Sequence, residues 1–386
     1  MAASPAGPSG RPGGTWAIIA GGGTGGHVVP AIAIATALVG RGHDPASIRF
    51  VGSRRGIETR LVPAAGFELT TLPGRGIARR LTAANVGAVA GLVAAFVRAV
   101  VLVRRLRPAV TVSVGGYASA PAVLASVLWR VPVVVAEQNA VPGVANRLAG
   151  RFARAAAVSF EGTPLPRAVV TGNPVRPEMV SADTSAAGRA AARAALGLAA
   201  DRSVVAVAGG SLGARRINDA VRELAAMWAE RADVCIYHVI GRRDFAAAMT
   251  APPVLPAGGL DYRPVEFEDR MPLLFAAADV GVQRAGASTV AELAVVGLPC
   301  VLVPLPGAPG DHQTVNARRL AEAGAAVLVP DNEMDGGRLA RELDRLLADT
   351  EARLRMAAAA RALGRPGAAD EVAALVDEVA GERGGD

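Results

Sequence analysis

Two glycine-rich turns, each between an apolar run and a helical pattern, constrain the fold of this chain more than any other feature. The first turn, residues 21–26, follows the apolar run 16–20. The second turn, residues 209–213, follows an apolar run that begins at Ser203. The order of strand, glycine turn and helix opens a parallel α/β sheet. Its recurrence predicts two doubly wound, Rossmann-like domains that face each other across a ligand-binding cleft.

The expected domain limits follow from the point where this pattern restarts. We expect an N-terminal domain over residues 15–175 and a C-terminal domain over 176–366, with a last helix at 367–382 that packs back on the first domain. A chain of 386 residues is long enough to bury two cores. Residues 1–14 are rich in Pro, Gly, Ser and Ala and are expected to form a disordered tail.

Charge and hydropathy restrict the surroundings in which the protein works. The formal net charge is +7 and every basic residue is arginine, so phosphates, nucleic acid or an anionic membrane are suitable partners. The apolar stretch Val86–Val103 is short for a membrane span and contains Arg98. We therefore expect a helix within a domain, with one face partly exposed. The two cysteines, Cys235 and Cys300, lie in separate apolar runs, which indicates a reducing compartment.

The first glycine turn also fits a dinucleotide-binding pattern. Gly21, Gly23 and Gly26 have the spacing G-x-G-x-x-G, which requires an acidic residue at the end of the next strand to hold a ribose. That strand ends at residues 50–53 without a carboxylate. The dinucleotide-binding pattern is therefore incomplete. A glycine turn at a helix N-terminus still favours a bound phosphate. The second turn adds a serine and two arginines and fits a pyrophosphate.

Two side chains have the chemistry of a transferase site. His27 follows the first turn and is a candidate general base, because an ordinary histidine titrates near neutrality. The alternative is a histidine that only caps or packs. Glu292 lies on the second helical turn after a small-residue segment, where it could accept hydrogen bonds from ribose hydroxyls or remain solvated. No cluster has metal-ligand spacing, so helix dipoles and arginine are expected to stabilise the leaving group.

Six motifs occur in order along almost the whole chain. They are GGGTGGHVVPAIAIA (21–35), GGYASAPAVLAS (115–126), EQNAVPGVANRLA (137–149), GNPVR (172–176), GGSLGARRIN (209–218) and RAGASTVAELAVVGLPCVLVPLP (284–306), the last followed by the loop GDHQTVNA (310–317). This ordered set resembles the MurG family of N-acetylglucosamine transferases of peptidoglycan synthesis.

The resemblance implies a B-type glycosyltransferase fold and a reaction. The N-terminal domain would face the acceptor and the membrane, and the C-terminal domain would bind the donor, UDP-N-acetylglucosamine. The sugar would pass with inversion to the C4 hydroxyl of undecaprenyl-pyrophosphoryl-muramyl-pentapeptide, without a cofactor or a metal. The protein would work as a peripheral protein on the anionic cytoplasmic face of the bacterial cell membrane. Other proteins of cell-wall synthesis are candidate partners, and nucleic acid is not expected.

The resemblance also implies roles for individual residues. Thr24, Gly25 and Gly26 would line the pyrophosphate region, and His27 would be the base for the acceptor hydroxyl. Tyr117 and Glu137 match positions on the acceptor side. Glu268 departs from the family, which usually has an aliphatic residue whose backbone contacts uracil. Positions of the donor site are matched by Asn139, Arg176, Ser211, Gly286, Ala287, Ser288, Thr289, Val290, Ala291, Glu292 (the ribose ligand) and Gln313.

Membrane contact is expected just before the long apolar segment. Arg75, Arg79 and Arg80 stand beside apolar residues there and would approach an anionic leaflet. The alternative is that these arginines form a solvated rim around a core helix. Two other functions remain open for the whole chain: a sugar-nucleotide epimerase of the same fold, and a non-catalytic scaffold of the cell-wall machinery.

Overall fold

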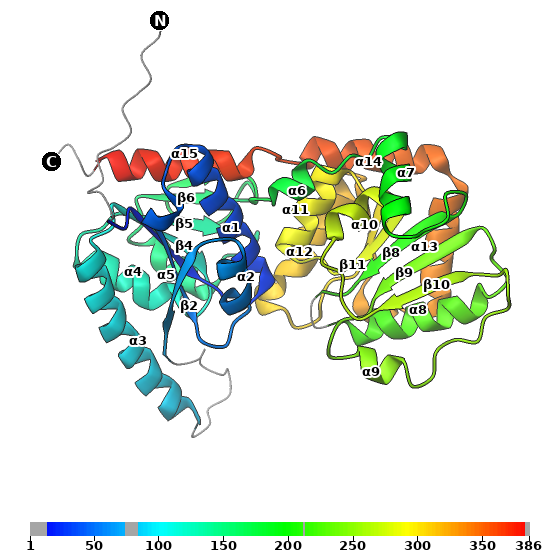
Figure 1. Cartoon of the computed structure of the whole chain (residues 1–386), viewed down its shortest axis with the longest axis horizontal. Helices are drawn as coiled ribbons and strands as arrows, with labels where there is room; N and C mark the ends of the chain where they lie inside the picture. The colour runs from blue at the N-terminus through cyan, green and yellow to red at the C-terminus, as the bar shows by residue number, and fades with distance from the viewer. Residues whose placement is uncertain (1–13, 74–83, 211–212, 383–386) are drawn as a thin grey trace, which may run out of the picture. The chain divides into compact units, whose positions relative to one another are not determined.

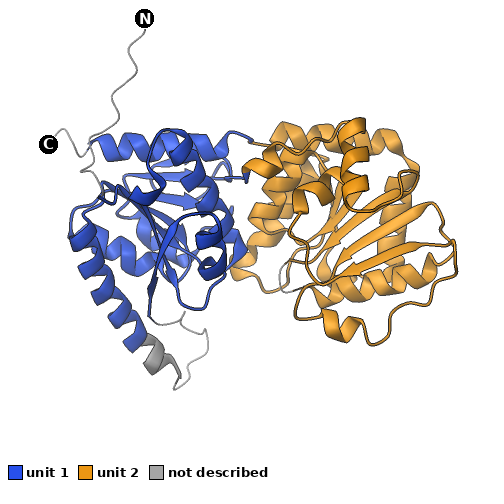
Figure 2. Ribbon diagram, in the orientation of Figure 1, with its two compact units in different colours: residues 1–176, 366–386 blue, residues 177–365 orange. Residues whose placement is uncertain are grey.

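The computed structural model describes residues 14–73, 84–210 and 213–382, with side chains of the helix that starts at Ala84 described from residue 90. The chain divides into two compact units (Figure 2). Unit 1 comprises Met1–Arg176 and Pro366–Asp386, and unit 2 comprises Pro177–Arg365. Each unit contains one parallel sheet covered by helices (Figure 1). The fold is therefore two α/β domains, as the repeated glycine turns predicted.

Unit 1 has a seven-stranded parallel sheet in the order β3-β2-β1-β4-β5-β6-β7. The order reverses between β1 and β4, which pair directly, and ligands bind at such a switch point. The strands are β1 (Ala17–Gly21), β2 (Ile48–Ser53), β3 (Glu68–Leu72), β4 (Val110–Gly115), β5 (Val133–Glu137), β6 (Ala155–Val158) and β7 (Ala168–Val170). The helices are α1 (Gly25–Gly40), α2 (Glu58–Ala64), α3 (Ala84–Leu106), α4 (Ser119–Leu128), α5 (Val144–Gly150) and α15 (Ala368–Gly381), with a short 3-10 turn η1 (Pro45–Ser47).

Both faces of this sheet are buried. Ala17 and Ile19 of β1 join a core with α1 and α15, whereas Ile18 and Ala20 pack with α3 and α4 on the opposite face. Successive side chains of a strand point to opposite faces, so a strand covered on both sides is predominantly apolar. This requirement explains why β1 reads as an uninterrupted apolar run.

The last helix, α15, belongs to unit 1 although unit 2 precedes it in the chain. Val372 and Val376 are fully buried in the core that α1 shares with the sheet. Asp377 adds two polar contacts, with Arg41 at 2.6 Å and with His43 at 2.7 Å. The chain therefore returns to its first unit to complete it.

Helix α3 packs against the rest of unit 1 with only one of its sides. Ala95, Ala99 and Val103 are buried, whereas Val93, Val97 and Val101 are 55–61% exposed. This agrees with the expectation of a domain helix with a partly exposed face. Among the described residues, no helix combines the length and the apolar character that crossing a membrane requires.

Unit 2 has a six-stranded parallel sheet in the order β10-β9-β8-β11-β12-β13. Its strands are β8 (Ser203–Ala208), β9 (Val234–Val239), β10 (Asp261–Val265), β11 (Val280–Gln283), β12 (Cys300–Leu302) and β13 (Ala326–Leu328). Its helices are α6 (Pro177–Val180), α7 (Ala186–Ala195), α8 (Arg215–Met227), α9 (Phe245–Ala248), α10 (Met271–Ala277), α11 (Ala287–Val296), α12 (His312–Glu322), α13 (Gly336–Ala348) and α14 (Thr350–Leu363), with 3-10 turns η2 (Pro309–Asp311) and η3 (Asp331–Glu333). Helices α8 and α13 pack together over a core with β8 and β11, whereas α11 packs with α6, α12 and α14.

Candidate functional site

The glycine turns after β1 and β4 allow two loops to meet at the switch point of unit 1. Gly115 and Gly116 both have φ near +90°, a region that favours glycine. A Cβ on Gly21 would collide with the carbonyl of Gly115, and one on Gly116 would collide with the carbonyl of Gly22. Only residues without side chains permit this approach, which brings the start of α1 to the carboxyl edge of the sheet.

The N-terminus of α1 carries four of the residues selected from the sequence. Thr24 is the N-cap in extended conformation, and its side chain does not cap the helix. Its Oγ1 lies 3.2 Å from Nδ1 of His27. Thr24 and Gly26 are exposed, and the first amides of a helix have no acceptor within it. Thr24, Gly25, Gly26 and His27 thus lie together at an exposed helix N-terminus, which suits an anion.

A buried carboxylate that the sequence analysis did not select holds this turn. Glu58 is 1% exposed and accepts hydrogen bonds from the amides of Gly23 (2.9 Å) and Ser53 (2.8 Å). Side chains on Gly22 or Gly56 would collide with its carboxylate. Glu58 therefore fixes the shape of the first glycine turn. The signal in the sequence was the small and polar segment around Gly52 that precedes α2.

The loop after β5 is organised by Glu137, which is 4% exposed. Its carboxylate accepts hydrogen bonds from the amide of Asn139 (2.9 Å), the amide of Gly143 (3.1 Å) and Nδ2 of Asn146 (3.0 Å). These bonds make Glu137 a positioning residue for Asn139. The hydroxyl of Tyr117 donates to the carbonyl of Pro73 at 3.1 Å, and burial raises the pKa of this tyrosine.

The structure gives less detail for the remaining candidates of unit 1 and for Ser211 of unit 2. Arg176 is partly exposed at the end of the unit. Arg75, Arg79 and Arg80 lie outside the described residues, as does Ser211 in the second glycine turn.

In unit 2 most of the donor-site candidates lie at the start of α11. Gly286 is the N-cap, and residues 287–292 form the first turns of the helix. The Oγ of Ser288 is buried without a hydrogen-bond partner in the described part of the chain. Glu292 is 9% exposed, so it is not a solvated surface glutamate. These residues are brought together by one helix N-terminus.

Gln313 reaches the same region from α12. Asn316 of this helix donates to the carbonyl of Ala285, next to the N-cap of α11, at 3.3 Å. The Oε1 of Gln313 accepts the amide of Leu305 at 2.9 Å and so holds the loop after β12. Gln313 therefore fixes a loop that borders the start of α11.

Glu268, the departure from the family pattern, has local partners. Its carboxylate accepts hydrogen bonds from the hydroxyl of Tyr237 and from the amide (2.7 Å) and side chain of Arg270. Burial alone would raise the pKa of Glu268, but the bonds from Arg270 and Tyr237 outweigh it and keep the pKa below its usual value. The carboxylate therefore stabilises the loop before α10.

His238 lies in surroundings that differ from those of His27. His238 is fully buried between the hydroxyl of Tyr262 and the side chain of Asn218, at 2.9 and 3.0 Å. Burial lowers the pKa of His238 to about 3, so it stays uncharged near neutrality and is a weak base. It is a core residue.

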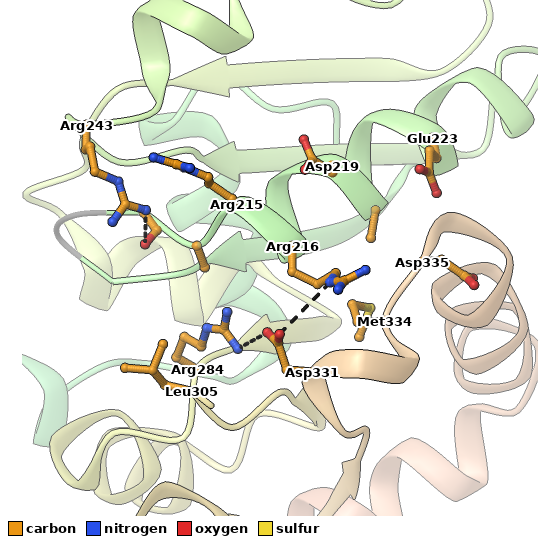
Figure 3. Close-up of a pocket in the computed structure, with 13 residues that line it drawn as sticks. Arg215, Arg216, Asp219, Glu223, Arg243, Arg284, Leu305, Asp331, Met334 and Asp335 are labelled. Atoms are coloured by element: carbon orange, nitrogen blue, oxygen red, sulfur yellow. Dashed lines mark hydrogen bonds and ion pairs between the residues drawn. The ribbon is translucent and has the colours of Figure 1, made fainter. Parts of the chain in front are cut away.

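Unit 2 also contains a pocket of about 620 Å³, which we call the arginine pocket (Figure 3). Four arginines line it, namely Arg215, Arg216, Arg243 and Arg284. The donor-site candidates described above are not among its lining residues. Within the described residues, no three His, Cys, Asp or Glu side chains are grouped so that they could hold a metal ion.

Comparison with known proteins gives two family matches. Residues 17–158 match the glycosyltransferase family 28 N-terminal domain, and residues 204–372 match the glycosyltransferase family 28 C-terminal domain. The chain is 43% identical to the UDP-N-acetylglucosamine--N-acetylmuramyl-(pentapeptide) pyrophosphoryl-undecaprenol N-acetylglucosamine transferase of Acidothermus cellulolyticus, over 95% of this chain and 98% of that protein. It is 41% identical to the protein of the same name from Moorella thermoacetica, over 93% and 97% of the two chains. The crystal structure of Acinetobacter baumannii MurG covers 94% of this chain with a TM-score of 0.73 and 29% identity, and 99% of that structure is matched.

Proposed function

The chain belongs to glycosyltransferase family 28, and from this premise we infer that it transfers N-acetylglucosamine from UDP-N-acetylglucosamine to undecaprenyl-pyrophosphoryl-muramyl-pentapeptide. The observation that carries this inference is the 43% identity over nearly the whole length of a relative named for this reaction. Unit 2 binds the donor, and unit 1 binds the acceptor. Two exposed or partly exposed helix N-termini, of α1 and α11, support a reaction between phosphate-bearing substrates.

The reaction is a displacement at the anomeric carbon of the donor sugar. His27 takes the proton of the acceptor's C4 hydroxyl, whose oxygen attacks C1. The bond between C1 and the diphosphate oxygen breaks, UDP leaves, and the new β-1,4 bond has inverted configuration. The N-terminus of α11 stabilises the charge on the diphosphate, and Glu292 accepts hydrogen bonds from the ribose. Positioning of the two substrates contributes a further large part of the rate.

Release of UDP tests the proposed function. We expect UDP and the disaccharide product only when UDP-N-acetylglucosamine and the lipid-linked muramyl-pentapeptide are both present. An epimerase would convert the donor without any acceptor. A scaffold would release no UDP with either substrate. Either of these two results would contradict the transferase.

Activity is expected to survive chelation. The reason is that the diphosphate's charge is balanced by helix N-termini and arginine side chains, and the described residues contain no metal-ligand cluster. The measurement is initial velocity with and without excess EDTA, with a Mg²⁺-dependent transferase as the control. Complete loss in EDTA that Mg²⁺ or Mn²⁺ restores would overturn the charge-stabilisation proposal.

Unit 1 docks reversibly on the anionic cytoplasmic face of the membrane, where the lipid-linked acceptor is held. The exposed valines of α3, which are Val93, Val97 and Val101, form an apolar stripe. Near the end of this helix the guanidinium of Arg104 lies over the ring of Trp129, 5.4 Å from its centre. A basic side chain near an anionic surface contributes about 1 kcal/mol, and shallow burial of the valines adds to it.

Replacing Val93, Val97 and Val101 by serine is expected to weaken sedimentation with vesicles that contain anionic lipid. UDP affinity should not change, because these side chains face away from the core. The matched control is Leu354→Ser, which removes a side chain of unit 2 that is 64% exposed. The change of Arg75, Arg79 and Arg80 to serine should abolish binding to the anionic vesicles, again without a change in UDP affinity. Equal sedimentation of the wild type and both variants would locate the docking surface elsewhere.

A further inference from the structure

We propose that Glu58 is a positioning residue for His27 and that it acts through the first glycine turn. The inference rests on the proposed function, in which His27 is the general base. Glu58 lies in none of the six sequence motifs, so it adds to the reaction a residue that the motifs do not contain.

Glu58 projects from a helix that is packed firmly into unit 1. It is the first residue of α2, which contacts α1 and β2 (Figure 1). Val62 of α2 is fully buried in the core that α1 shares with the sheet, and Leu61 packs against the same core. The backbone that carries the Glu58 carboxylate is therefore fixed by apolar packing.

Three hydrogen bonds compensate the burial of the Glu58 carboxylate. Its Oε2 accepts the amide of Gly23 at 2.9 Å, and its Oε1 accepts the amide and the hydroxyl of Ser53, both at 2.8 Å. A buried carboxylate is costly unless it is hydrogen-bonded, and bonds to an ionised group are about twice as strong as neutral ones. The bond to Gly23 is therefore a strong attachment between α2 and the first glycine turn.

The surroundings of Glu58 exclude direct contact with a substrate. The residue is 1% exposed, and a Cβ on Gly22, Gly52 or Gly56 would collide with its side chain. In a dinucleotide-binding domain a carboxylate at the end of the second strand holds a ribose. Glu58 bonds to Ser53, the last residue of β2, but both of its oxygens are directed to the chain itself. Its carboxylate therefore holds protein and not ligand.

The first glycine turn depends on such an attachment. Residues 21–23 are three successive glycines, all with positive φ. Glycine has more backbone freedom than any other residue, so this sequence does not fix its own conformation. The amide of Gly22 donates to the carbonyl of Gly115 at 3.3 Å, whereas the bond from Gly23 to Glu58 is shorter and involves a charge. The bond to Glu58 is therefore the stronger of the two.

His27 is bound to the residue that follows this turn. Its amide donates to the carbonyl of Thr24 at 3.1 Å, and its Nδ1 lies 3.2 Å from Oγ1 of Thr24. Thr24 is joined directly to Gly23, so a displacement of Gly23 moves Thr24 and both of its contacts with His27. Nε2 of His27 lies beside Gly115, 3.1 Å from the position that a Cβ would occupy there. The hydrogen bond from Gly23 to Glu58 thus sets the place of the imidazole.

The test is a double-mutant cycle between Glu58 and His27. Glu58→Gln keeps the shape of the side chain, but its NH2 group must face at least one of the three donors. We expect kcat to fall by roughly tenfold to a hundredfold, the scale that follows a misplacement of about 1 Å. The same change in a His27→Ala background should alter kcat by less than about twofold, because no imidazole remains to be misplaced.

Hydrogen exchange of the Gly23 amide, followed by NMR, tests the attachment without turnover. The bond to a buried carboxylate should protect this amide in the wild type, and Glu58→Gln should make its exchange at least about tenfold faster. Glu58→Asp is the second variant if Glu58→Gln does not fold. It keeps the charge but is one methylene shorter, so exchange should again be faster and kcat lower. An exchange rate equal to that of the wild type contradicts the proposal.

Two further variants serve as controls. Glu68→Gln removes a carboxylate from β3 of the same unit, where the side chain is 56% exposed, and should keep the wild-type kcat and exchange rate. Ser53→Ala removes one bond to Oε1 and leaves the bond to Gly23, so its kcat should fall less than that of Glu58→Gln.

An equal loss of kcat from Glu58→Gln in both backgrounds would overturn the proposal, because Glu58 would then act on stability and not through His27. Wild-type kcat in Glu58→Gln would overturn it as well, and so would wild-type turnover in His27→Ala. A wild-type protein that releases no UDP with both substrates contradicts the proposed function instead. The exchange rate of the Gly23 amide still reports in that case whether Glu58 holds the turn.

Discussion

Replacing His27 by alanine is expected to reduce turnover by roughly 10²–10⁴-fold, the usual contribution of a general base. The imidazole lies at the exposed start of α1, and the hydroxyl of Thr24, 3.2 Å from Nδ1, orients the ring. The base acts on the acceptor hydroxyl, so binding of UDP-N-acetylglucosamine should stay near the wild-type value. The result should thus be a fall in kcat without loss of donor affinity.

Steady-state kinetics and donor binding by calorimetry check this expectation. The matched control is His43→Ala, which removes a histidine of unit 1 that stacks on Trp16 and contacts Asp377. That variant should lose stability and retain kcat. A His27→Ala protein with turnover close to the wild type would remove His27 from the mechanism.

Replacing Glu292 by alanine is expected to have the opposite signature. The side chain is 9% exposed on the second turn of α11, at a helix N-terminus that suits the diphosphate. Loss of two hydrogen bonds from ribose hydroxyls to a carboxylate costs about 2–4 kcal/mol, which is roughly a 30-fold to 1000-fold weaker Kd for UDP. Turnover at saturating donor should change much less.

Direct titration with UDP measures this effect. Glu292→Gln should lie between the wild type and the alanine variant, because an amide oxygen still accepts hydrogen bonds. Glu322→Ala removes an exposed carboxylate from α12 and should bind UDP as the wild type does. Unchanged UDP affinity in Glu292→Ala would assign the ribose to another residue.

The sheets could be predicted from the sequence because both faces of each central strand are buried. The run 16–20 became Ala17–Gly21, and the run 48–52 became Ile48–Ser53. A strand covered on both sides is predominantly apolar, and such a run is recognisable from the sequence alone. Residues 131–139 gave a shorter strand, Val133–Glu137, because Glu137 already bonds to the loop that follows.

The supports of the candidate site could not be predicted, because their partners are distant in sequence. Glu58 acts on Gly23, thirty-five residues away, and Tyr237 contacts Glu268, thirty-one residues away. The arginine pocket gathers side chains that follow several different strands. The periodicity of helices and strands relates residues that are close together in the sequence. It contains no information on contacts between residues that are far apart in the sequence. The reactive candidates, His27 and Glu292, were found because glycine-rich or small-residue turns precede them directly.

The return of α15 to unit 1 determines when the protein can finish folding during its synthesis. A ribosome makes roughly 5–20 residues per second, so unit 2, residues 177–365, takes roughly 10–40 s to emerge. Throughout that time the core that will receive Val372 and Val376 lacks its covering helix. The nascent first unit therefore presents an apolar face to chaperones, and a transcript cut short before α15 yields an incomplete first unit beside a completed second one.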